Sequence, residues 1–297
     1  MPRKIGIFIN PQRDPGLRVT EQLLKEIQRQ GVQAILEREQ VLEFSDFNER
    51  IQVLECLFSY GSFKECELLI CLGGDGTFLS AAHYASAEDL PVIGINLGSV
   101  GFLPSVQIDE IDSMVSQLVN GQYTCEKRML LSVTHLDADK KEKGRYRALN
   151  DAVISRGGYS RILTTDLLID GKHIERIPAD GLIVATPTGS TAYSLSSGGP
   201  ITHPQLEVLL ITPISPHTLH NRSYVTCPNS VVQLNILEYP YPVALTIDGR
   251  ISRIVETGDC IMITKDEHYA TFVRLGEDKF FSELPKKIQL RGIPYSG

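Results

Sequence analysis

A glycine-rich turn around one carboxylate is the segment of this 297-residue chain best suited to chemistry. Gly73, Gly74 and Gly76 surround Asp75, and glycine lets the backbone turn sharply and approach a ligand closely. Thr77 is placed to cap the helix expected to follow, whose free N–H groups would face an anion. A carboxylate does not attract phosphate, so Asp75 is better suited to hold Mg²⁺ or to take a proton from an attacking hydroxyl. The turn therefore predicts a phosphoryl-transfer site, and an ordinary strand-to-helix turn with Asp75 as a cap is the alternative.

Two further polar segments have the composition of a binding site. Asn150 and Asp151 directly precede the apolar residues 152–154, at the entrance to an expected strand. An adjacent amide and carboxylate could grip vicinal sugar hydroxyls, and an Asx turn is the competing interpretation. Residues 186–200 combine serine, threonine, glycine and one tyrosine without any charged residue. We interpret that segment as built to hydrogen-bond a neutral polar ligand while packing closely against a ring.

Several familiar catalytic and cofactor motifs are absent from the sequence. It contains no G-x-x-x-x-G-K-[ST] phosphate loop, no G-x-G-x-x-G dinucleotide fingerprint and no G-x-S-x-G nucleophile elbow. His217 and His220 do not form H-E-x-x-H, and no carboxylate neighbour supports a metal site there. A P-loop is therefore excluded, and the usual dinucleotide fold of dehydrogenases is unsupported.

The first part of the chain alternates short apolar runs with helix-like stretches, which is typical of parallel βαβ units. Strands are expected at residues 5–9, 34–36, 68–72 and 92–95, and helices around residues 23–27, 78–84 and 111–118. The wholly apolar run 68–72 suits a strand that is buried on both faces of a sheet. We expect residues 1–123 to form an α/β domain with a parallel sheet that carries the glycine-rich turn.

The second part has a different pattern, with strand-like runs and few helices. These runs lie at residues 130–134, 166–169, 182–185, 231–237, 244–247 and 261–264. The dipeptides Asp170-Gly171 and Asp248-Gly249 are strong hairpin signals between such runs. We expect a β-rich domain over residues 124–275, and a return of residues 276–297 to the first domain is an open option. The expected fold class is an α/β N-terminal domain with a parallel sheet plus a β-rich C-terminal domain.

Composition limits the partners of the chain. The net charge is −7, which argues against general attraction to nucleic acid or to an anionic membrane. Six widely spaced cysteines without a C-x-x-C pair are typical of reduced thiols in a cytosolic protein. No run approaches the roughly 18 apolar residues of a membrane span. We therefore expect a cytoplasmic protein with neither nucleic acid nor membrane as a partner.

Taken together, these residues resemble the NAD kinase family, the ATP-NAD kinases of bacterial type. The turn at 73–77 matches its first motif, residues 150–151 match its Asn-(Glu/Asp) motif, and residues 186–194 match its most distinctive stretch. Residues 94–96, 101–103 and 216–219 agree as well, so the resemblance covers essentially the whole chain. Lipid kinases and phosphofructokinases have similar Gly-Gly-Asp-Gly turns, but the 186–194 stretch separates this chain from both.

The resemblance implies transfer of phosphate from ATP-Mg²⁺ to the adenosine-ribose 2′-hydroxyl of NAD⁺, giving NADP⁺ and ADP, at a site between the two domains. Asp75 is implied as the catalytic proton acceptor. The implied NAD-binding residues are Asp75, Gly76, Asn150, Asp151, Arg161, Asp180, Thr191, Ala192, Tyr193, Ser196 and Arg250. The implied ATP phosphate-binding residues are Gly73, Gly74, Gly76 and Thr77. Mg²⁺ or another divalent ion would enter on the ATP phosphates without a fixed protein ligand, and contact with Asp75 through water is an option.

The family resemblance also implies a homodimer or homotetramer in which a neighbouring subunit closes the NAD site. Three positions depart from the family pattern: Ser80 replaces a frequent Arg or Lys, Pro178 stands where a basic residue often occurs, and Arg250 replaces the usual Gln. Two alternatives remain at this point, a dinucleotide sensor without catalysis and a lipid or sugar kinase that shares the turn. Retention of Asp75 argues against the sensor.

Overall fold

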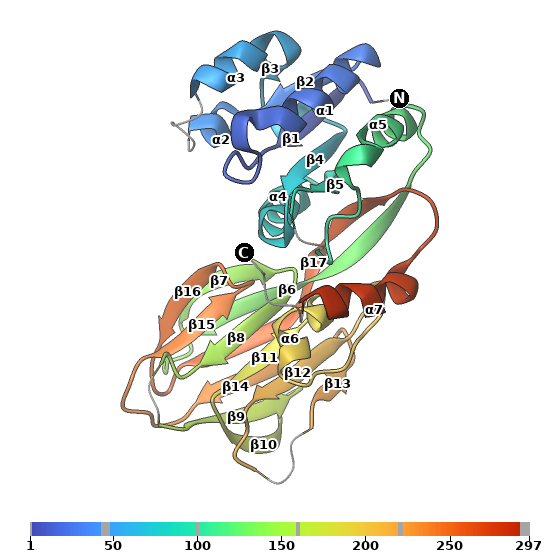
Figure 1. Ribbon diagram of the computed structural model, residues 1–297. Helices are drawn as coiled ribbons and strands as arrows, with labels where there is room; N and C mark the ends of the chain where they lie inside the picture. The colour runs from blue at the N-terminus through green and yellow to red at the C-terminus, as the bar shows by residue number, and fades with distance from the viewer. Residues whose placement is uncertain (1, 43–47, 99–100, 159–160, 219–221, 292–297) are drawn as a thin grey trace. The chain divides into compact units, whose positions relative to one another are not determined.

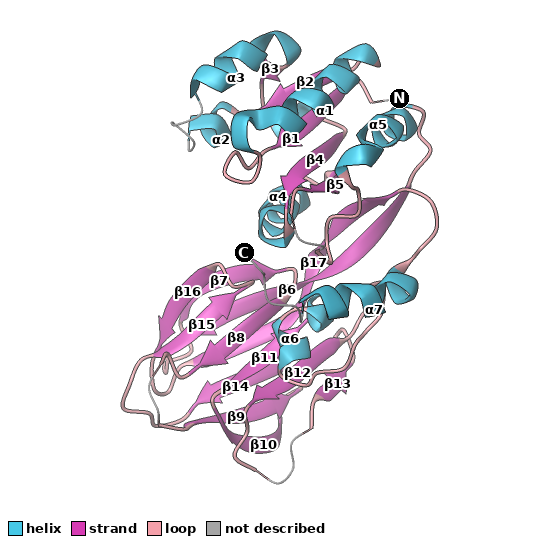
Figure 2. Cartoon of the chain, viewed as in Figure 1, coloured by secondary structure: helices cyan, strands magenta, loops and turns pink. Residues whose placement is uncertain are grey.

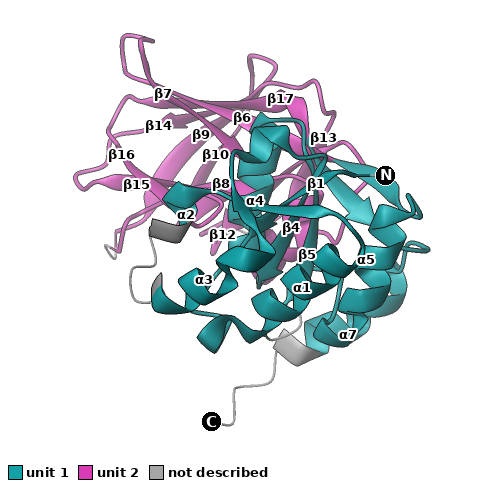
Figure 3. Cartoon of the chain, turned by 90° about the horizontal axis from the view of Figure 1, so that it is seen from above, with its two compact units in different colours: residues 1–127, 270–297 teal, residues 128–269 magenta. Residues whose placement is uncertain are grey.

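The computed structural model describes the chain except for residues 1, 43–47, 99–100, 159–160, 219–221 and 292–297. Two compact units make up the chain, residues 1–127 with 270–297 and residues 128–269 (Figure 3). Strands β6 (Thr124–Leu136) and β17 (Cys260–Arg274) each run from one unit into the other. The boundaries expected after residues 123 and 275 fall at the outer ends of these strands. Leu219 and His220, noted in the sequence, lie outside the described residues.

A parallel sheet forms the centre of the first unit, which confirms the predicted α/β class (Figure 1). Within the described residues its neighbouring strands pair in parallel, from β3 at one edge to the last residues of β17 at the other. The strands are, in sheet order, β3 (Ser59–Tyr60), β2 (Gln33–Leu36), β1 (Lys4–Phe8), β4 (Leu68–Gly73) and β5 (Pro91–Asn96), followed by β17. All six residues of β4 are buried, as its apolar sequence predicts.

The first unit also contains helices, which lie between its strands along the chain or follow the last strand (Figure 2). They are α1 (Arg18–Arg29), α2 (Arg38–Leu42), α3 (Asn48–Leu54), α4 (Asp75–Ala87), α5 (Ile111–Val119) and α7 (Phe280–Arg291), with short 3₁₀ turns at Pro15–Leu17, Glu55–Leu57, Phe63–Glu65 and Ile108–Glu110. In α1, Leu23, Leu24 and Ile27 lie at helical spacing and are fully buried. The helices expected around residues 23–27, 78–84 and 111–118 are thus confirmed.

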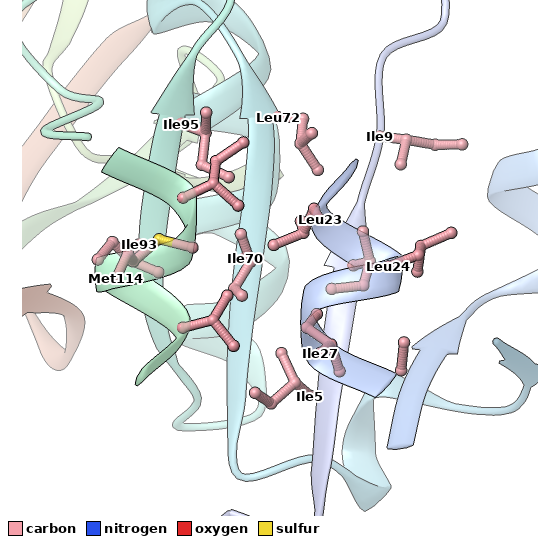
Figure 4. Close-up of a cluster of buried hydrophobic side chains, with 14 of the residues drawn as sticks. Ile5, Ile9, Leu23, Leu24, Ile27, Ile70, Leu72, Ile93, Ile95 and Met114 are labelled. Atoms are coloured by element: carbon pink, nitrogen blue, oxygen red, sulfur yellow. The ribbon is translucent and has the colours of Figure 1, made fainter. Parts of the chain in front are cut away.

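The two faces of β5 pack against different helices. Ile93 and Ile95 join Met114 of α5 and the α1 side chains in one apolar core (Figure 4). The intervening Gly94 has no side chain, and a Cβ there would come 2.5 Å from the Phe78 ring of α4. Because side chains alternate along a strand, α4 covers the face opposite to α1 and α5. This packing brings the first turn of α4 to the carboxyl ends of β4 and β5.

The second unit is built almost entirely from antiparallel strands, which confirms the predicted β-rich half (Figure 2). One sheet has the order β13-β12-β11-β8-β15-β16, and the other contains β10-β9-β14-β17 with β6 and β7. The strands are β7 (Glu142–Ala148), β8 (Asp151–Ser155), β9 (Leu163–Ile169), β10 (Lys172–Ala179), β11 (Gly181–Ala185), β12 (Leu209–Ile214), β13 (Tyr224–Thr226), β14 (Val232–Ile236), β15 (Val243–Ile247) and β16 (Ile251–Val255). Alternate side chains of both sheets share one apolar core.

Both predicted hairpin turns are present in the second unit. Asp170 and Gly171 connect β9 to β10 with φ values of 52° and 74°, and Asp248 and Gly249 connect β15 to β16 with φ values of 50° and 65°. Two residues separate the paired strand ends at the first turn and three at the second, and Asp-Gly tolerates the positive φ at both of its positions in each turn. The second turn places Asp248 beside the start of β8, because β15 pairs with β8.

Candidate active site

The glycine-rich turn joins the end of β4 directly to the start of α4. Gly73 is the last strand residue, Gly74 precedes the helix, and Asp75 is the first residue of α4. A Cβ on Gly73 would come 2.4 Å from the Thr77 side chain, so only glycine fits at that point. A Cβ on Gly74 or on Gly76 would meet nothing within 4 Å. The space that a side chain would fill at those two positions is therefore open, so a ligand can approach the backbone closely there.

Thr77 does not cap the helix, so that part of the sequence prediction is wrong. The helix begins three residues earlier than expected, and its first backbone bond runs from Phe78 N to Gly74 O at 3.0 Å. Thr77 consequently lies inside the first turn. Its Oγ1 accepts a hydrogen bond from Nδ2 of Asn10 at 2.8 Å. The side chain thus ties the end of β1 to the start of α4.

Two backbone amides orient the half-buried carboxylate of Asp75. Phe102 N donates to Oδ2 at 3.3 Å and Leu103 N donates to Oδ1 at 3.0 Å. Gly101 lies directly against the same carboxylate, since a Cβ there would approach Oδ1 to 2.2 Å. Residues 101–103 were noted in the sequence only as agreeing with a family motif. The structure gives them a physical role, because they hold Asp75 in one orientation at the start of the helix.

Ser80, which stands where a basic side chain is frequent in the family, does not supply the positive charge of such a side chain. Its hydroxyl donates to the carbonyl oxygen of Gly76 at 3.1 Å, one turn back in the same helix. Such a bond uses the hydroxyl proton within α4. A phosphate near this turn would therefore depend on backbone N–H groups and on the helix N-terminus.

A cavity of about 410 Å³ in the second unit brings together residues from both polar segments of its sequence. It is lined by Asn150, Asp151, Val153, Ser155, Ala192, Tyr193, Thr246, Asp248 and Gly249. Asn150, Asp151, Ala192 and Tyr193 were all expected to bind NAD. Tyr193 begins the short helix α6 (Tyr193–Ser196) and remains 46% exposed, so its ring is available to a ligand.

Asp151 is an acidic group in an unusually apolar place. It is 4% exposed, at the first position of β8. The pKa of its carboxyl is raised to about 7, mainly by burial and then by the nearby Asp248 carboxylate, while a hydrogen bond from the Tyr193 backbone N–H opposes the shift. Asp151 therefore changes between its protonated and ionised forms close to neutral pH.

The uncharged stretch 186–200 uses its hydroxyls mainly to hold itself in place. Thr186 donates to the carbonyl oxygen of Leu149 at 2.5 Å and accepts from Gly189 N at 3.1 Å. Ser194 shares a hydrogen bond with Thr212 at 3.1 Å. Because these hydroxyls are buried and bonded to other protein groups, hydrogen bonding of a ligand by the stretch stays a prediction. The Thr186 bond holds the stretch close to the segment that carries Asn150. The packing there is tight, since a Cβ on Gly189 would come 2.1 Å from the Asn150 carbonyl oxygen.

Comparison with known proteins agrees with this arrangement. Residues 5–123 match the model of the ATP-NAD kinase N-terminal domain, and residues 149–275 match that of the ATP-NAD kinase C-terminal domain. The chain belongs to the ATP-NAD kinase family. It is 40% identical over 291 residues to an NAD kinase of Ruminiclostridium cellulolyticum, with 97% of this chain and 99% of the relative covered. Membership of this family excludes the lipid or sugar kinase alternative.

Two solved structures share the fold at low sequence identity. A yeast NADH kinase complexed with NADH has a TM-score of 0.83 at 24% identity, covering 99% of this chain and 90% of its own. An NAD kinase from Archaeoglobus fulgidus in complex with ATP has a TM-score of 0.71 at 23% identity, covering 98% of this chain and all of its own. Both likenesses support the α/β unit and the β-rich unit described above.

Several residues implied by the ATP-NAD kinase resemblance lie outside the lining of the cavity. Thr191 is buried and donates to the Thr188 carbonyl oxygen at 3.3 Å, whereas Ser196 and Arg250 are exposed. Asp180 forms an ion pair with Arg156 at 2.8 Å, a residue that the sequence did not single out. Arg161 is exposed, and its carbonyl oxygen accepts from the Tyr239 hydroxyl at 2.8 Å.

Pro178, the second departure from the family pattern, lies in β10 opposite Thr164 of β9. Asp248 is the acidic residue of the cavity lining that the sequence analysis did not assign to the site, since it was assigned only to a hairpin turn. Its contribution depends on the pairing of β15 with β8, which the local sequence does not reveal.

Within the described residues, no helix is both long and apolar enough to span a membrane.

Proposed function

We propose that this ATP-NAD kinase family member transfers the γ-phosphoryl group of ATP to the 2′-hydroxyl of the adenosine ribose of NAD⁺, giving NADP⁺ and ADP. The observation that carries the proposal is the carboxylate of Asp75, oriented by two backbone N–H groups at the first residue of α4. Phosphoryl transfer requires alignment and charge neutralisation more than covalent participation of the protein. An oriented carboxylate beside phosphate-binding amides supplies the acid–base part of that requirement.

Asp75 would accept the proton that leaves the ribose hydroxyl as it attacks. A positioned carboxylate assists such a step by typically 10²–10⁴-fold. The donor phosphates would bind the N–H groups of Gly73, Gly74 and Gly76, and the absence of a side chain leaves open space beside Gly74 and Gly76. Thr77 accepts from Asn10 but still has its own hydroxyl proton, which it can donate to a phosphate oxygen.

A divalent ion, Mg²⁺ or a similar hard cation, would supply most of the positive charge. Within the described residues, no three His, Cys, Asp or Glu side chains are grouped as a protein-built metal site requires. An ion that enters on the phosphates of ATP needs no such group of side chains, and Asp75 is the carboxylate that could reach it through water. When bound, the ion would neutralise the phosphate charge that develops during transfer.

The cavity of the second unit would bind NAD. Asp151 in its ionised form would accept hydrogen bonds from sugar hydroxyls, Asn150 would donate and accept, and the exposed ring of Tyr193 would pack against a flat part of the dinucleotide. Outer contacts to the rest of the dinucleotide are proposed for the remaining family-implied residues: Asp75, Gly76, Arg161, Asp180, Thr191, Ala192, Ser196 and Arg250.

Incubation of the purified protein with ATP, Mg²⁺ and NAD⁺ tests the proposal. NADP⁺ formation is followed with an NADP-specific dehydrogenase, and parallel reactions contain NADH in place of NAD⁺ or polyphosphate in place of ATP. We expect NADP⁺ to form in proportion to the ADP released. Binding of NAD⁺ without any NADP⁺ or ADP would instead identify a dinucleotide sensor.

Family membership also supports a homo-oligomer, either a dimer or a tetramer, in which a neighbouring subunit closes the NAD site. Together with the composition, it supports a cytoplasmic location. Light scattering coupled to gel filtration over a dilution series tests the assembly. A fully active monomer at every concentration would contradict it.

A further inference from the structure

The carboxylate of Asp248 is buried against the backbone that carries Asn150 and Asp151. Its side chain lines the cavity and is 7% exposed. Oδ1 accepts from Asn150 N at 2.7 Å and from Asp151 N at 2.9 Å, while Oδ2 accepts from Leu149 N at 2.8 Å. The Asp248 N–H in turn donates to the Asp151 carbonyl oxygen at 2.9 Å. One side chain thus satisfies three consecutive backbone donors at the entrance to β8.

The other Asp-Gly hairpin of the same unit shows what such a turn requires by itself. Asp170 has the same left-handed conformation but is exposed at the surface. Its carboxylate accepts from one backbone donor, Val231 N at 2.8 Å, and from the Ser230 hydroxyl at 3.2 Å. The left-handed backbone of the turn therefore explains an aspartate at both positions. It does not explain why the Asp248 carboxylate is buried and accepts from three backbone amides. The environment of Asp248 needs a further explanation.

We propose that Asp248 is a positioning residue, whose carboxylate fixes the backbone of residues 149–151 so that the Asn150 and Asp151 side chains face the dinucleotide. This inference rests on the proposed binding of NAD by those two residues. Asparagine could not replace Asp248 without loss. Its single oxygen can accept from two of the amides, but its NH₂ group would then face the third N–H as donor to donor.

The charge of Asp248 also acts on Asp151 directly. It is one of the causes that raise the pKa of Asp151 to about 7, after burial itself. Among the described residues that line the cavity, Asp151 and Asp248 are the acidic ones, and the lining contains no lysine, arginine or histidine. Removal of the Asp248 charge should therefore lower the pKa of Asp151. This gives a readout that loss of structure alone would not produce.

The test compares Asp248→Asn with Asp170→Asn as the matched control. NAD⁺ binding is measured by isothermal titration calorimetry, and kinetic constants for NAD⁺ and ATP are measured from pH 5.5 to 9. For Asp248→Asn we expect the Kd and KM for NAD⁺ to rise by about tenfold or more, since a charged acceptor is lost, with a much smaller change for ATP. The acidic limb of the kcat/KM profile for NAD⁺ should move to lower pH. Asp170→Asn should leave both properties unchanged.

Wild-type NAD⁺ affinity and an unmoved pH profile in Asp248→Asn would overturn the proposal and leave Asp248 as a turn residue only. If that variant fails to fold, Asp248→Glu decides the question. It retains the charge but displaces the three amides by one methylene, so KM for NAD⁺ should rise while the acidic limb stays in place. A wild-type KM in Asp248→Glu would also overturn the proposal. Absence of NADP⁺ formation by the unmodified protein would instead contradict the proposed function.

Discussion

Replacement of Asp75 by asparagine is the most direct test of the glycine-rich turn. The two side chains have nearly the same shape, so the helix start and the approach of Gly101 should be preserved. The variant loses the negative charge and one of the two acceptor oxygens that face Phe102 N and Leu103 N. Its amide oxygen can retain the shorter bond, from Leu103 N at 3.0 Å, and its NH₂ group then faces the longer contact. We expect the variant to fold.

The expected kinetic effect follows from the proton-transfer role. General-base assistance by a positioned side chain contributes typically 10²–10⁴-fold, so kcat should fall by about that factor, or ~2.7–5.4 kcal/mol of barrier. NAD⁺ affinity should change much less than kcat, because the residues that line the cavity of the second unit, where most of the proposed NAD contacts lie, remain intact. Steady-state kinetics of NADP⁺ formation, together with calorimetric NAD⁺ binding, separate the two effects.

A second variant distinguishes the charge of Asp75 from its orientation. In Gly101→Ala the new Cβ would lie 2.2 Å from Oδ1, so the carboxylate must move while its charge remains. We expect a substantial loss of kcat there too, without rescue by Mg²⁺. Partial recovery of Asp75→Asn at high Mg²⁺ would favour a role in ordering the ion through water. If Asp75→Asn turns over at near the wild-type rate in ordinary Mg²⁺, both proposed roles of this carboxylate are wrong.

Other predictions concern the cavity of the second unit. Asp151→Ala should raise KM for NAD⁺ about tenfold or more and change KM for ATP far less, since a hydrogen bond to a charged group is worth about 1.5–3 kcal/mol; equal effects on both substrates would indicate misfolding. Folding raises the pKa of Asp151 from 3.8 to about 7, so binding of a proton to this carboxyl stabilises the folded state. This contribution to the free energy of unfolding is full below pH 3.8 and is lost as the pH rises through 7. Calorimetry should therefore find Asp151→Asn more stable than wild type by up to ~4 kcal/mol at pH 8, with the difference shrinking towards pH 4. Gly189→Ala should cost about 1–3 kcal/mol in urea unfolding, because its Cβ would overlap the Asn150 carbonyl oxygen, and an unchanged midpoint would refute that packing. Arg250→Gln should change nucleotide preference without changing Tm, whereas unaltered kinetics with every nucleotide would make this exposed arginine a surface residue.

The fold could be predicted where burial imposes a clear period on the sequence. β4 and α1 were recognisable because a buried strand is apolar throughout and a surface helix carries an apolar stripe. By contrast, α2 and α3 were missed, since they are short and polar. The edge strands β13 and β16 were also missed, because their exposed residues carry no alternating pattern. Helix α7 was missed because Pro285 lies within it.

The site was predictable as a set of segments but not as a set of contacts. Composition located Asp75, Asn150, Asp151 and Tyr193, since glycine turns and uncharged polar loops are visible in a sequence. It could not show that the hydroxyls of Thr186 and Ser194 bond to Leu149 and Thr212, which lie on neighbouring segments. It also could not show that Asp248 meets residues 149–151 across almost a hundred positions of chain. Partners that pairing of distant strands brings together leave no local signal.

Asp75 and Asp151 are placed in environments that suit different tasks. Asp75 is half-buried on a helix terminus, and two amides from one loop fix its direction without enclosing it. A group that exchanges a proton with a substrate must remain open to that substrate. Asp151 is enclosed at a strand entrance next to a second carboxylate, an arrangement that costs stability when it ionises. A ligand whose hydroxyls donate to Asp151 would offset that cost, so binding of NAD should itself lower the pKa of Asp151.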